Sequence, residues 1–193
     1  MLAIENVVFD LGAVLIDWDP RYLYRKIFTD EEEMEFFLKN VCSPDWNNEQ
    51  DSGRSWQEAT ELLQKEHPKY FNEIAAYSAR WTEMLGGEIS DSVEILRAVK
   101  ERGFPVYALT NWSRETFPVA RRLYEFLTWF DGILVSGEEA VKKPDPRIFE
   151  LFLKRYGLKP DTTFFIDDNP VNVEVARNFG IQAYVFSWPA RLR

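Results

Sequence analysis

Short runs of β-branched and aromatic residues alternate with helical patterns over most of the chain. The runs span residues 6–9, 104–109, 132–135, 163–166 and 183–186, and helical patterns over 114–127, 146–156 and 170–179 separate the last four. Short apolar runs bounded by turn residues are typical of buried strands. Strands that alternate with helices form parallel sheets. The sequence therefore predicts an α/β fold in which helices flank a parallel sheet.

The first connection is much longer than the others. Residues 10–103 separate the first run from the second, although a single crossover helix needs far fewer. A capping-box pattern at Asp91 and Glu94 predicts that this crossover helix spans 91–102. The apolar spacing in the remaining segment looks helical throughout. We therefore expect a core of residues 1–16 and 89–193, and an inserted helical cap of residues 17–88.

Polar or turn-forming residues follow the ends of four predicted strands. In open parallel sheets, ligands bind beyond the carboxyl ends of the strands. Each residue by itself has an ordinary explanation as part of a turn or a helix cap. Together, in this order, they predict one polar site at a single edge of the sheet. In chain order they are Asp10, Gly12, Thr110, Asn111, Lys142, Lys143, Asp167 and Asp168.

The three carboxylates in this group need a cation to offset their mutual repulsion. Two carboxylates at about 4 Å repel each other by roughly 4 kcal/mol at an effective dielectric constant near 20. Mg²⁺ prefers oxygen ligands from one or two carboxylates, with water and a substrate phosphate completing its coordination. Lys143 would then help to bind a phosphate, while Thr110 and nearby backbone amides hold its remaining oxygens.

Four motifs of the sequence resemble those of the haloacid dehalogenase-like hydrolase superfamily. They are Phe-Asp-Leu-Gly-Ala-Val at 9–14, Leu-Thr-Asn at 109–111, Lys-Pro-Asp-Pro at 143–146 and Phe-Ile-Asp-Asp-Asn at 165–169. The match spans nearly the whole chain, and the insertion after the first motif is where that family's helical cap sits. The resemblance thus implies a Rossmann-like core with an inserted helical cap.

The same resemblance implies a phosphatase reaction in two steps. Asp10 would attack phosphorus to form an aspartyl-phosphate, which water then hydrolyses, with Lys143 as the second catalytic residue. Asp10, the backbone carbonyl of Gly12 and Asp168 would hold Mg²⁺, and Asp167 would ligate it directly or through water. Three residues would hold the phosphoryl group as charge develops during transfer: Thr110, Asn111 and Lys143.

Gly12 is a departure from the family pattern. Many phosphatases of this family carry there a second aspartate, which protonates the leaving group and later activates water. A general acid typically contributes about 10² to 10⁴ in rate. Three explanations stay open: another acid reaches in, the substrate has a good leaving group, or the protein is slow or silent. The candidate acids are Asp17, Asp19, Asp45, Glu49 and Asp51.

A glycine at position 12, together with the Asp17-Trp18-Asp19 segment, also resembles the pattern of a branch that includes bacterial glucose-1-phosphate phosphatases. This likeness makes a sugar phosphate one candidate substrate of a Mg²⁺-dependent phosphomonoesterase. One alternative is a 2-haloacid dehalogenase, which needs no divalent metal and typically lacks paired acids in the fourth motif, so Asp167 and Asp168 argue against it. The other alternative is a catalytically quiet module that binds phosphate or has a regulatory role.

Composition narrows the classes of partner. The net charge of −9 has the wrong sign for binding a nucleic-acid backbone, so we expect no nucleic-acid partner.

No apolar run is long enough for a membrane helix, and no secretory signal is recognised, so we expect a cytoplasmic protein, monomeric or homodimeric. The single cysteine and single histidine, Cys42 and His67, cannot build a His-rich zinc site. Three tryptophans near the motifs or the cap could contact substrate or simply pack: Trp18, Trp46 and Trp112. Arg54 could contact substrate or be a solvated side chain beside a cap at Ser55.

Overall fold

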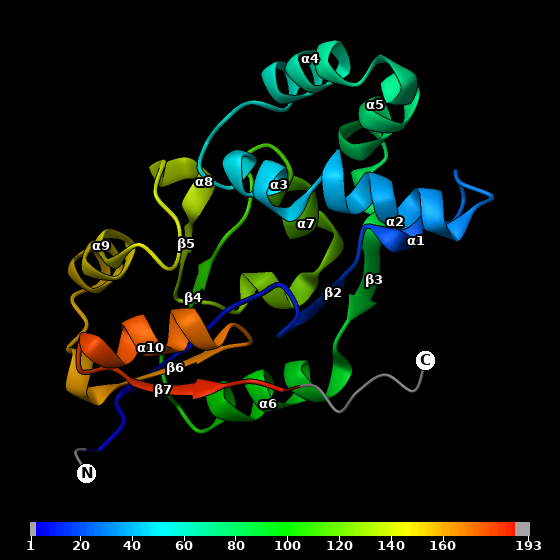
Figure 1. The fold of residues 1–193 in the computed structure, drawn as a ribbon. Coiled ribbons are helices and arrows are strands. Elements are labelled where there is room, and N and C mark those ends of the chain that lie inside the picture. The colour runs from blue at the N-terminus through cyan, green and yellow to red at the C-terminus, as the bar shows by residue number, and fades with distance from the viewer. Residues whose placement is uncertain (1–2, 188–193) are drawn as a thin grey trace.

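A five-stranded parallel sheet forms the lower part of the molecule in the computed structural model, which describes residues 3–187 (Figure 1). The strand order is β5-β4-β1-β6-β7, and every neighbouring pair runs parallel. The strands are β1 (Asn6–Phe9), β4 (Val106–Thr110), β5 (Gly132–Val135), β6 (Thr163–Asp167) and β7 (Gln182–Val185). The sheet confirms the predicted Rossmann-like α/β fold.

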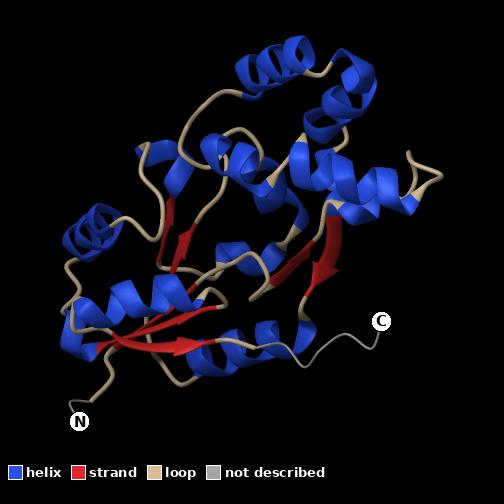
Figure 2. Cartoon of the chain, viewed as in Figure 1, coloured by secondary structure: helices blue, strands red, loops and turns tan. Residues whose placement is uncertain are grey.

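Helices cover both faces of the sheet (Figure 2). Val7 and Phe9 of β1 pack in one apolar cluster with α6 (Ser90–Glu101) and α7 (Phe117–Leu123). Val8 points the other way, into a second cluster with α9 (Pro146–Tyr156) and α10 (Pro170–Asn178). Side chains alternate between the faces of a strand, so a run that is apolar at every position is buried on both sides.

Two of the predicted helices differ from those in the structure. The pattern over 114–127 divides into α7 and a 3-10 helix, η3 (Glu125–Thr128). Pro118 occupies the first turn of α7, where a missing N–H costs nothing, so the helix starts there. Helix α6 starts at Ser90, and Ile89 is its N-cap. Asp91 is therefore not the cap; its carboxylate lies in the first turn, where the helix dipole stabilises it.

The start of β4 also differs from the prediction. The strand runs from Val106 to Thr110, whereas the pattern indicated 104–109. Pro105 has no N–H to donate to a neighbouring strand, which accounts for the later start. The strand continues through Thr110, so that residue is held in the sheet at the edge where the site was predicted.

The insertion is mostly helical. Its helices are α1 (Arg21–Tyr24), α2 (Glu31–Asn40), α3 (Pro44–Gln50), α4 (Trp56–Glu66), η1 (Pro68–Tyr70), α5 (Phe71–Ala79) and η2 (Trp81–Met84). Asp30 and Ser55 cap α2 and α4 by accepting backbone N–H groups. Aromatic rings fill its interior, among them Trp46, Trp56 and Tyr77, whose centroids lie 5.1–5.6 Å apart.

The two ends of the insertion are strands, so the expectation of helix throughout was wrong there. β2 (Ile16–Trp18) pairs antiparallel with β3 (Leu85–Glu88). A Cβ at Gly86 would lie 2.0 Å from Oδ2 of Asp17, so a larger residue there would have to displace the Asp17 side chain.

The division into a core (1–16 and 89–193) and a cap (17–88) remains a proposal. The β2–β3 ribbon crosses its boundary, and positions 1–2 and 188–193 of the core lie outside the described residues. Within residues 3–187, no helix is long and apolar enough to span a membrane.

Candidate active site

The carboxyl ends of two neighbouring strands, β1 and β6, bring the predicted acidic residues together. Asp10 follows β1, Asp167 ends β6, and the backbone N–H of Asp10 donates to the carbonyl of Ile166 at 2.8 Å. Carboxylate oxygens of Asp10, Asp167 and Asp168 all lie within 4.8 Å of one another. The predicted polar site is therefore a real cluster at one edge of the sheet.

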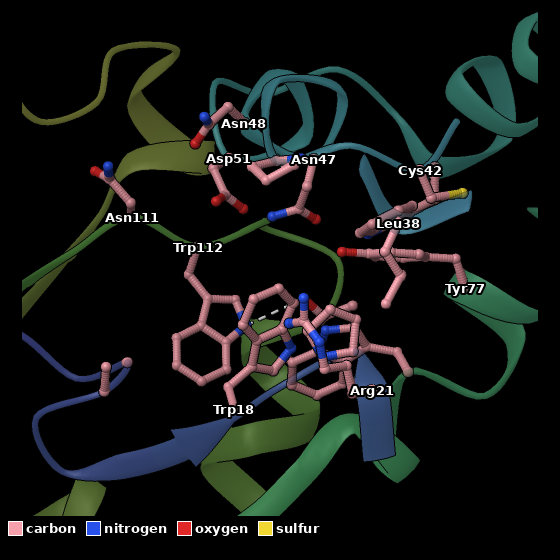
Figure 3. Close-up of a pocket in the computed structure, with 17 residues that line it drawn as sticks. Trp18, Arg21, Leu38, Cys42, Asn47, Asn48, Asp51, Tyr77, Asn111 and Trp112 are labelled. Atoms are coloured by element: carbon pink, nitrogen blue, oxygen red, sulfur yellow. Dashed lines mark hydrogen bonds between the residues drawn. The ribbon is translucent and has the colours of Figure 1, made fainter. Parts of the chain in front are cut away.

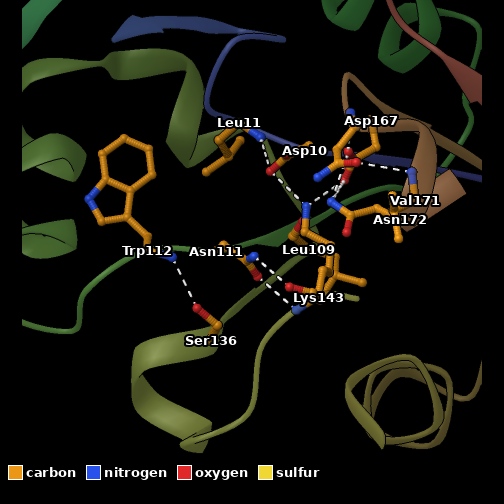
Figure 4. A network of polar contacts seen from close by, with 11 residues as sticks. Asp10, Leu11, Leu109, Asn111, Trp112, Ser136, Lys143, Asp167, Val171 and Asn172 are labelled. Atoms are coloured by element: carbon orange, nitrogen blue, oxygen red, sulfur yellow. Dashed lines mark hydrogen bonds and ion pairs between the residues drawn. The ribbon is translucent and has the colours of Figure 1, made fainter. Parts of the chain in front are cut away.

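Lys143 lies at the centre of this cluster (Figure 4). Its side chain is fully buried, and Nζ donates to Oδ2 of Asp167 at 2.7 Å and to the carbonyl of Leu109 at 2.8 Å. Nζ also lies 2.9 Å from Oδ1 of Asp10. Burial would lower the pKa of Lys143, but the charges of Asp10 and Asp167 outweigh it and raise the pKa. The ammonium therefore stays charged and joins the two carboxylates.

Asp10 presents one free oxygen. Its Oδ1 accepts the N–H of Leu11 at 2.8 Å and pairs with Lys143. Every hydrogen bond and ion pair that Asp10 makes with described residues reaches this oxygen, so Oδ2 is available to a ligand. Burial raises the pKa of Asp10 to about 7, with Lys143 opposing the rise and Asp167 adding to it. A bound cation would remove this penalty on the ionised form.

Asp167 is held on both oxygens. Oδ1 accepts the backbone N–H of Asn169 at 2.8 Å, and the amide of Asn172 reaches Oδ1 at 3.0 Å and Oδ2 at 3.1 Å. With Lys143 also on Oδ2, this fully buried carboxylate is saturated. Asp168, by contrast, is exposed. The sequence analysis missed Asn172; its only signal is an amide in the first turn of the helix that follows Asp167.

Two residues of the second motif have different environments. Thr110 is completely buried, and its Oγ1 has no hydrogen-bond partner among the described residues. The side chain of Asn111 is fully used, because its amide donates to the carbonyl of Lys143 and its Oδ1 accepts the N–H of Lys143, both at 2.9 Å. Thr110 therefore has an unused donor, whereas Asn111 fixes the backbone of the loop that carries Lys143.

A cavity of about 390 Å³ lies between the sheet edge and the insertion (Figure 3). Gly12, Ala13 and Asn111 line it from the sheet side. The rest of its wall is mainly apolar, and the large side chains in it are Trp18, Leu38, Trp56, Tyr77, Trp81 and Trp112. Its polar groups on the insertion are Arg21, Asn47, Asn48 and Asp51.

Among the candidate replacement acids, Asp51 is the one that lines this cavity. Asp17 accepts the hydroxyl of Tyr22 at 2.9 Å, and Asp19 accepts the backbone N–H of Arg21 at 2.9 Å. Asp45 and Glu49 are exposed on α3.

Of the four residues that the sequence offered as possible substrate contacts, two line the cavity and two do not. Trp18 and Trp112 line the cavity, whereas Trp46 packs against Trp56 and Tyr77. The guanidinium of Arg54 is turned back onto α3, where it donates to Oε1 of Gln50 at 2.7 Å and to the carbonyl of Trp46 at 3.0 Å.

Comparison with known families identifies the family of this chain. The chain matches the description "haloacid dehalogenase-like hydrolase" over residues 4–180. It belongs to the haloacid dehalogenase-like hydrolase family. This match confirms the family resemblance predicted from the four motifs.

Relatives in this family include both phosphatases and dehalogenases. Sesquiterpene phosphatase astK of Aspergillus oryzae is 27% identical over 177 residues, which cover 92% of this chain and 87% of that protein. (S)-2-haloacid dehalogenase 4A of Burkholderia cepacia is 29% identical over 90 residues, which cover 47% of this chain and 39% of that protein.

A solved structure shows the same fold over the whole chain. The magnesium complex of HAD family enzyme bt-2542 from Bacteroides thetaiotaomicron superposes with a TM-score of 0.77 at 22% identity. The match covers 99% of this chain and 97% of that one.

Proposed function

We propose that this hydrolase is a Mg²⁺-dependent phosphomonoesterase that acts on a small organic phosphate through an aspartyl-phosphate on Asp10. The observation that carries the proposal is the buried arrangement of Asp10 with Lys143, in which one carboxylate oxygen is bonded and the other is free. Thr110 adds an unused hydroxyl at the end of the neighbouring strand. An oxyanion such as phosphate satisfies both groups.

The donor set of the cluster fits Mg²⁺. Hard carboxylate oxygens are what this cation prefers, and three such groups lie within 4.8 Å of one another. Because Asp167 is saturated by Lys143 and Asn172, we assign direct ligation to Asp10 and Asp168 and water-mediated ligation to Asp167. The carbonyl of Gly12 is the fourth proposed protein ligand. When bound, the cation offsets the charge of the carboxylates and of the phosphoryl oxygens.

The side chains around Asp10 have separate parts in the reaction. Oδ2 of Asp10 attacks phosphorus, while the N–H of Leu11 and the ammonium of Lys143 hold Oδ1 and fix the direction of attack. The hydroxyl of Thr110 donates a hydrogen bond to a phosphoryl oxygen, which gives this buried group a partner. For Asn111 we propose a positioning role through the backbone of Lys143, in place of the phosphate contact predicted for its side chain.

The cavity wall supports a substrate with a large apolar portion. Four tryptophans, Trp18, Trp56, Trp81 and Trp112, face a volume of about 390 Å³, which is in the range that holds a small organic ligand. Polar side chains such as Arg21, Asn47 and Asn48 also line the wall, so the preference for an apolar substrate rests on the tryptophans. The relative that acts on sesquiterpenes agrees with an apolar substrate. A sugar phosphate, expected from the Gly12 branch, is the competing substrate class.

A screen of phosphate esters tests this function. The purified protein is given prenyl, aryl, alkyl and sugar phosphates with Mg²⁺, and released phosphate is measured. We expect turnover that EDTA abolishes and added Mg²⁺ restores, and that Asp10→Asn loses. Asp45→Asn, which removes an exposed acid of the insertion, is the matched control and should retain turnover.

Two results would overturn the proposal. Halide release from a 2-haloacid in excess EDTA, with no phosphate release from any ester, would establish the dehalogenase alternative. Binding of Mg²⁺ and phosphate without turnover of any ester, and without an aspartyl-phosphate analogue formed from fluoroberyllate, would establish the non-catalytic alternative.

A further inference from the structure

Asp51 occupies an unusual place for a carboxylate. It follows the last residue of α3 and serves as the C-cap of that helix, where the helix dipole disfavours a negative charge. Its side chain lines the same cavity as Gly12 and Asn111, and Figure 3 shows the carboxylate directed into that cavity on the side of Trp112. An acid of the insertion is thus brought to the cavity that begins at the sheet edge.

The chain around Asp51 is fastened to the loop that follows β4. The carboxylate accepts the backbone N–H of Ser113. The backbone carbonyl of Asp51 accepts the hydroxyl of Ser136 at 2.5 Å, and that hydroxyl in turn accepts the N–H of Trp112 at 3.0 Å. Asp51 is therefore attached, through side chain and backbone, to residues that directly follow Thr110 and Asn111.

The contact needs a glycine on the core side. A Cβ at Gly137 would lie 2.6 Å from the carbonyl oxygen of Trp112 and 2.6 Å from the N–H nitrogen of Arg114. Only glycine therefore lets α8 (Ser136–Glu139) approach the loop after β4 closely enough for Ser136 to bridge it to Asp51.

The surroundings of Asp51 raise its pKa towards neutral pH. Burial raises the pKa of Asp51 to about 7, although Lys142 and the N–H of Ser113 act in the opposite direction. A carboxyl group with a pKa near the working pH can both give and take a proton. Arg21, Cys42 and Tyr77 are titratable or charged side chains that line the same cavity, and Glu115 lies nearby, where it accepts the N–H of Trp56.

Arg21 is already engaged by other acids. Its guanidinium donates to both oxygens of Glu35, at 2.6 and 2.7 Å, and lies 3.4 Å from Asp19. Lys142 is thus the cation whose charge acts directly on Asp51.

We propose that Asp51 is the general acid and base that replaces the carboxylate missing at Gly12. This assignment rests on the proposed phosphatase function. In the first step, a bond forms between Oδ2 of Asp10 and phosphorus, and the bond from phosphorus to the leaving oxygen breaks. The electron pair goes to that oxygen, which takes the proton of Asp51. In the second step, the oxygen of a water molecule forms a bond to phosphorus while Asp51 accepts a proton from that water. The bond from phosphorus to Oδ2 of Asp10 breaks, its electron pair returns to the carboxylate, and phosphate is released.

The assignment is tested by pairing two substrates with Asp51→Asn. An alkyl phosphate needs a proton on its leaving oxygen, whereas p-nitrophenyl phosphate releases a stable anion. We expect Asp51→Asn to lower kcat/KM for the alkyl ester by about 100-fold or more, the range of a general acid, and to change that for the nitrophenyl ester by less than about fivefold. An equal loss for both esters would assign Asp51 a structural role and overturn the proposal, as would no loss for either.

The pH profile is an independent readout. A general acid must be protonated, so kcat of the wild-type protein for the alkyl ester should fall as the pH rises through about 7. Asp51→Asn should lack this limb. If the variant retains the same limb, a different group supplies the proton and the assignment is wrong.

Gly12→Asp provides a rescue in the Asp51→Asn background. A Cβ at Gly12 meets nothing within 4 Å, so the first atom of a side chain fits there. We expect the double variant to recover at least about tenfold of the lost alkyl phosphatase activity, since an acid worth about 10² to 10⁴ is supplied again. If the wild-type protein hydrolyses neither ester, the proposed function itself fails. If it hydrolyses both and the variants show no leaving-group dependence, only the assignment of Asp51 fails.

Discussion

Thr110→Val should stabilise the free protein while weakening its hold on phosphate. The hydroxyl of Thr110 is fully buried and has no partner among the described residues. A buried polar group without a hydrogen bond costs about 1–3 kcal/mol. Valine has nearly the same shape and lacks that group, so we expect the free energy of unfolding to rise by about 1 kcal/mol.

The same substitution removes a proposed donor to the phosphoryl group. A hydrogen bond to a charged group contributes about 1.5–3 kcal/mol. At 1.36 kcal/mol per factor of ten, inorganic phosphate should inhibit the variant about 10- to 150-fold less strongly than the wild-type protein. Because kcat depends on the same contact in the transition state, it should fall as well.

Urea unfolding without ligand and phosphate inhibition measure the two effects. Thr163→Val is the matched control, because Thr163 is also buried but its hydroxyl donates to the carbonyl of Lys159 at 2.7 Å. That variant should lose about 1 kcal/mol of stability and keep its affinity for phosphate. If Thr110→Val is destabilised as much as the control, or is inhibited by phosphate like the wild-type protein, the reasoning about the unpaired hydroxyl is refuted.

Three further substitutions test the site. Asp10→Asn should abolish phosphate release while the near-ultraviolet circular dichroism stays that of the wild-type protein; wild-type-like turnover would exclude Asp10 as the nucleophile. Lys143→Met should cost about 3–5 kcal/mol in urea unfolding, because it leaves two buried carboxylates without their cation, and adding Asp167→Asn should return part of the loss. Unchanged stability would contradict the ion-pair network. Ser136→Ala should cost about 1–3 kcal/mol and speed hydrogen exchange at the N–H of Trp112; protection equal to wild type would show that the bridge is unimportant.

The sequence predicted the parallel sheet and the position of its polar edge. Period and composition determine which segments are buried strands, and the carboxyl ends of parallel strands share one edge. The sequence alone therefore places Asp10, Lys143 and Asp167 together. The short strands β2 and β3 could not, because their pairing depends on contacts between residues that lie far apart in the chain.

The partners of the site residues were less accessible to sequence reasoning. Neither the saturation of Asp167 by Asn172 nor the use of Asn111 by the backbone of Lys143 follows from residue type or spacing. Asp51 was one of five candidate acids, and only the tertiary path of α3 distinguishes it from Asp45 and Glu49 on the same segment. Local patterns report burial and turns, whereas hydrogen-bond partners are set by the packing of distant elements.

The bridge from Ser136 to the carbonyl of Asp51 ties the position of the proposed proton donor to contact between the insertion and the core. If the insertion swings away from the sheet, this bond and the one from Ser113 break together, and the proposed proton donor leaves with it. An open molecule then retains its nucleophile but has nothing to protonate an alcohol. A compound too bulky for the insertion to close over it would bind but would not be hydrolysed. Selectivity by substrate size would then act on the rate of reaction more than on binding.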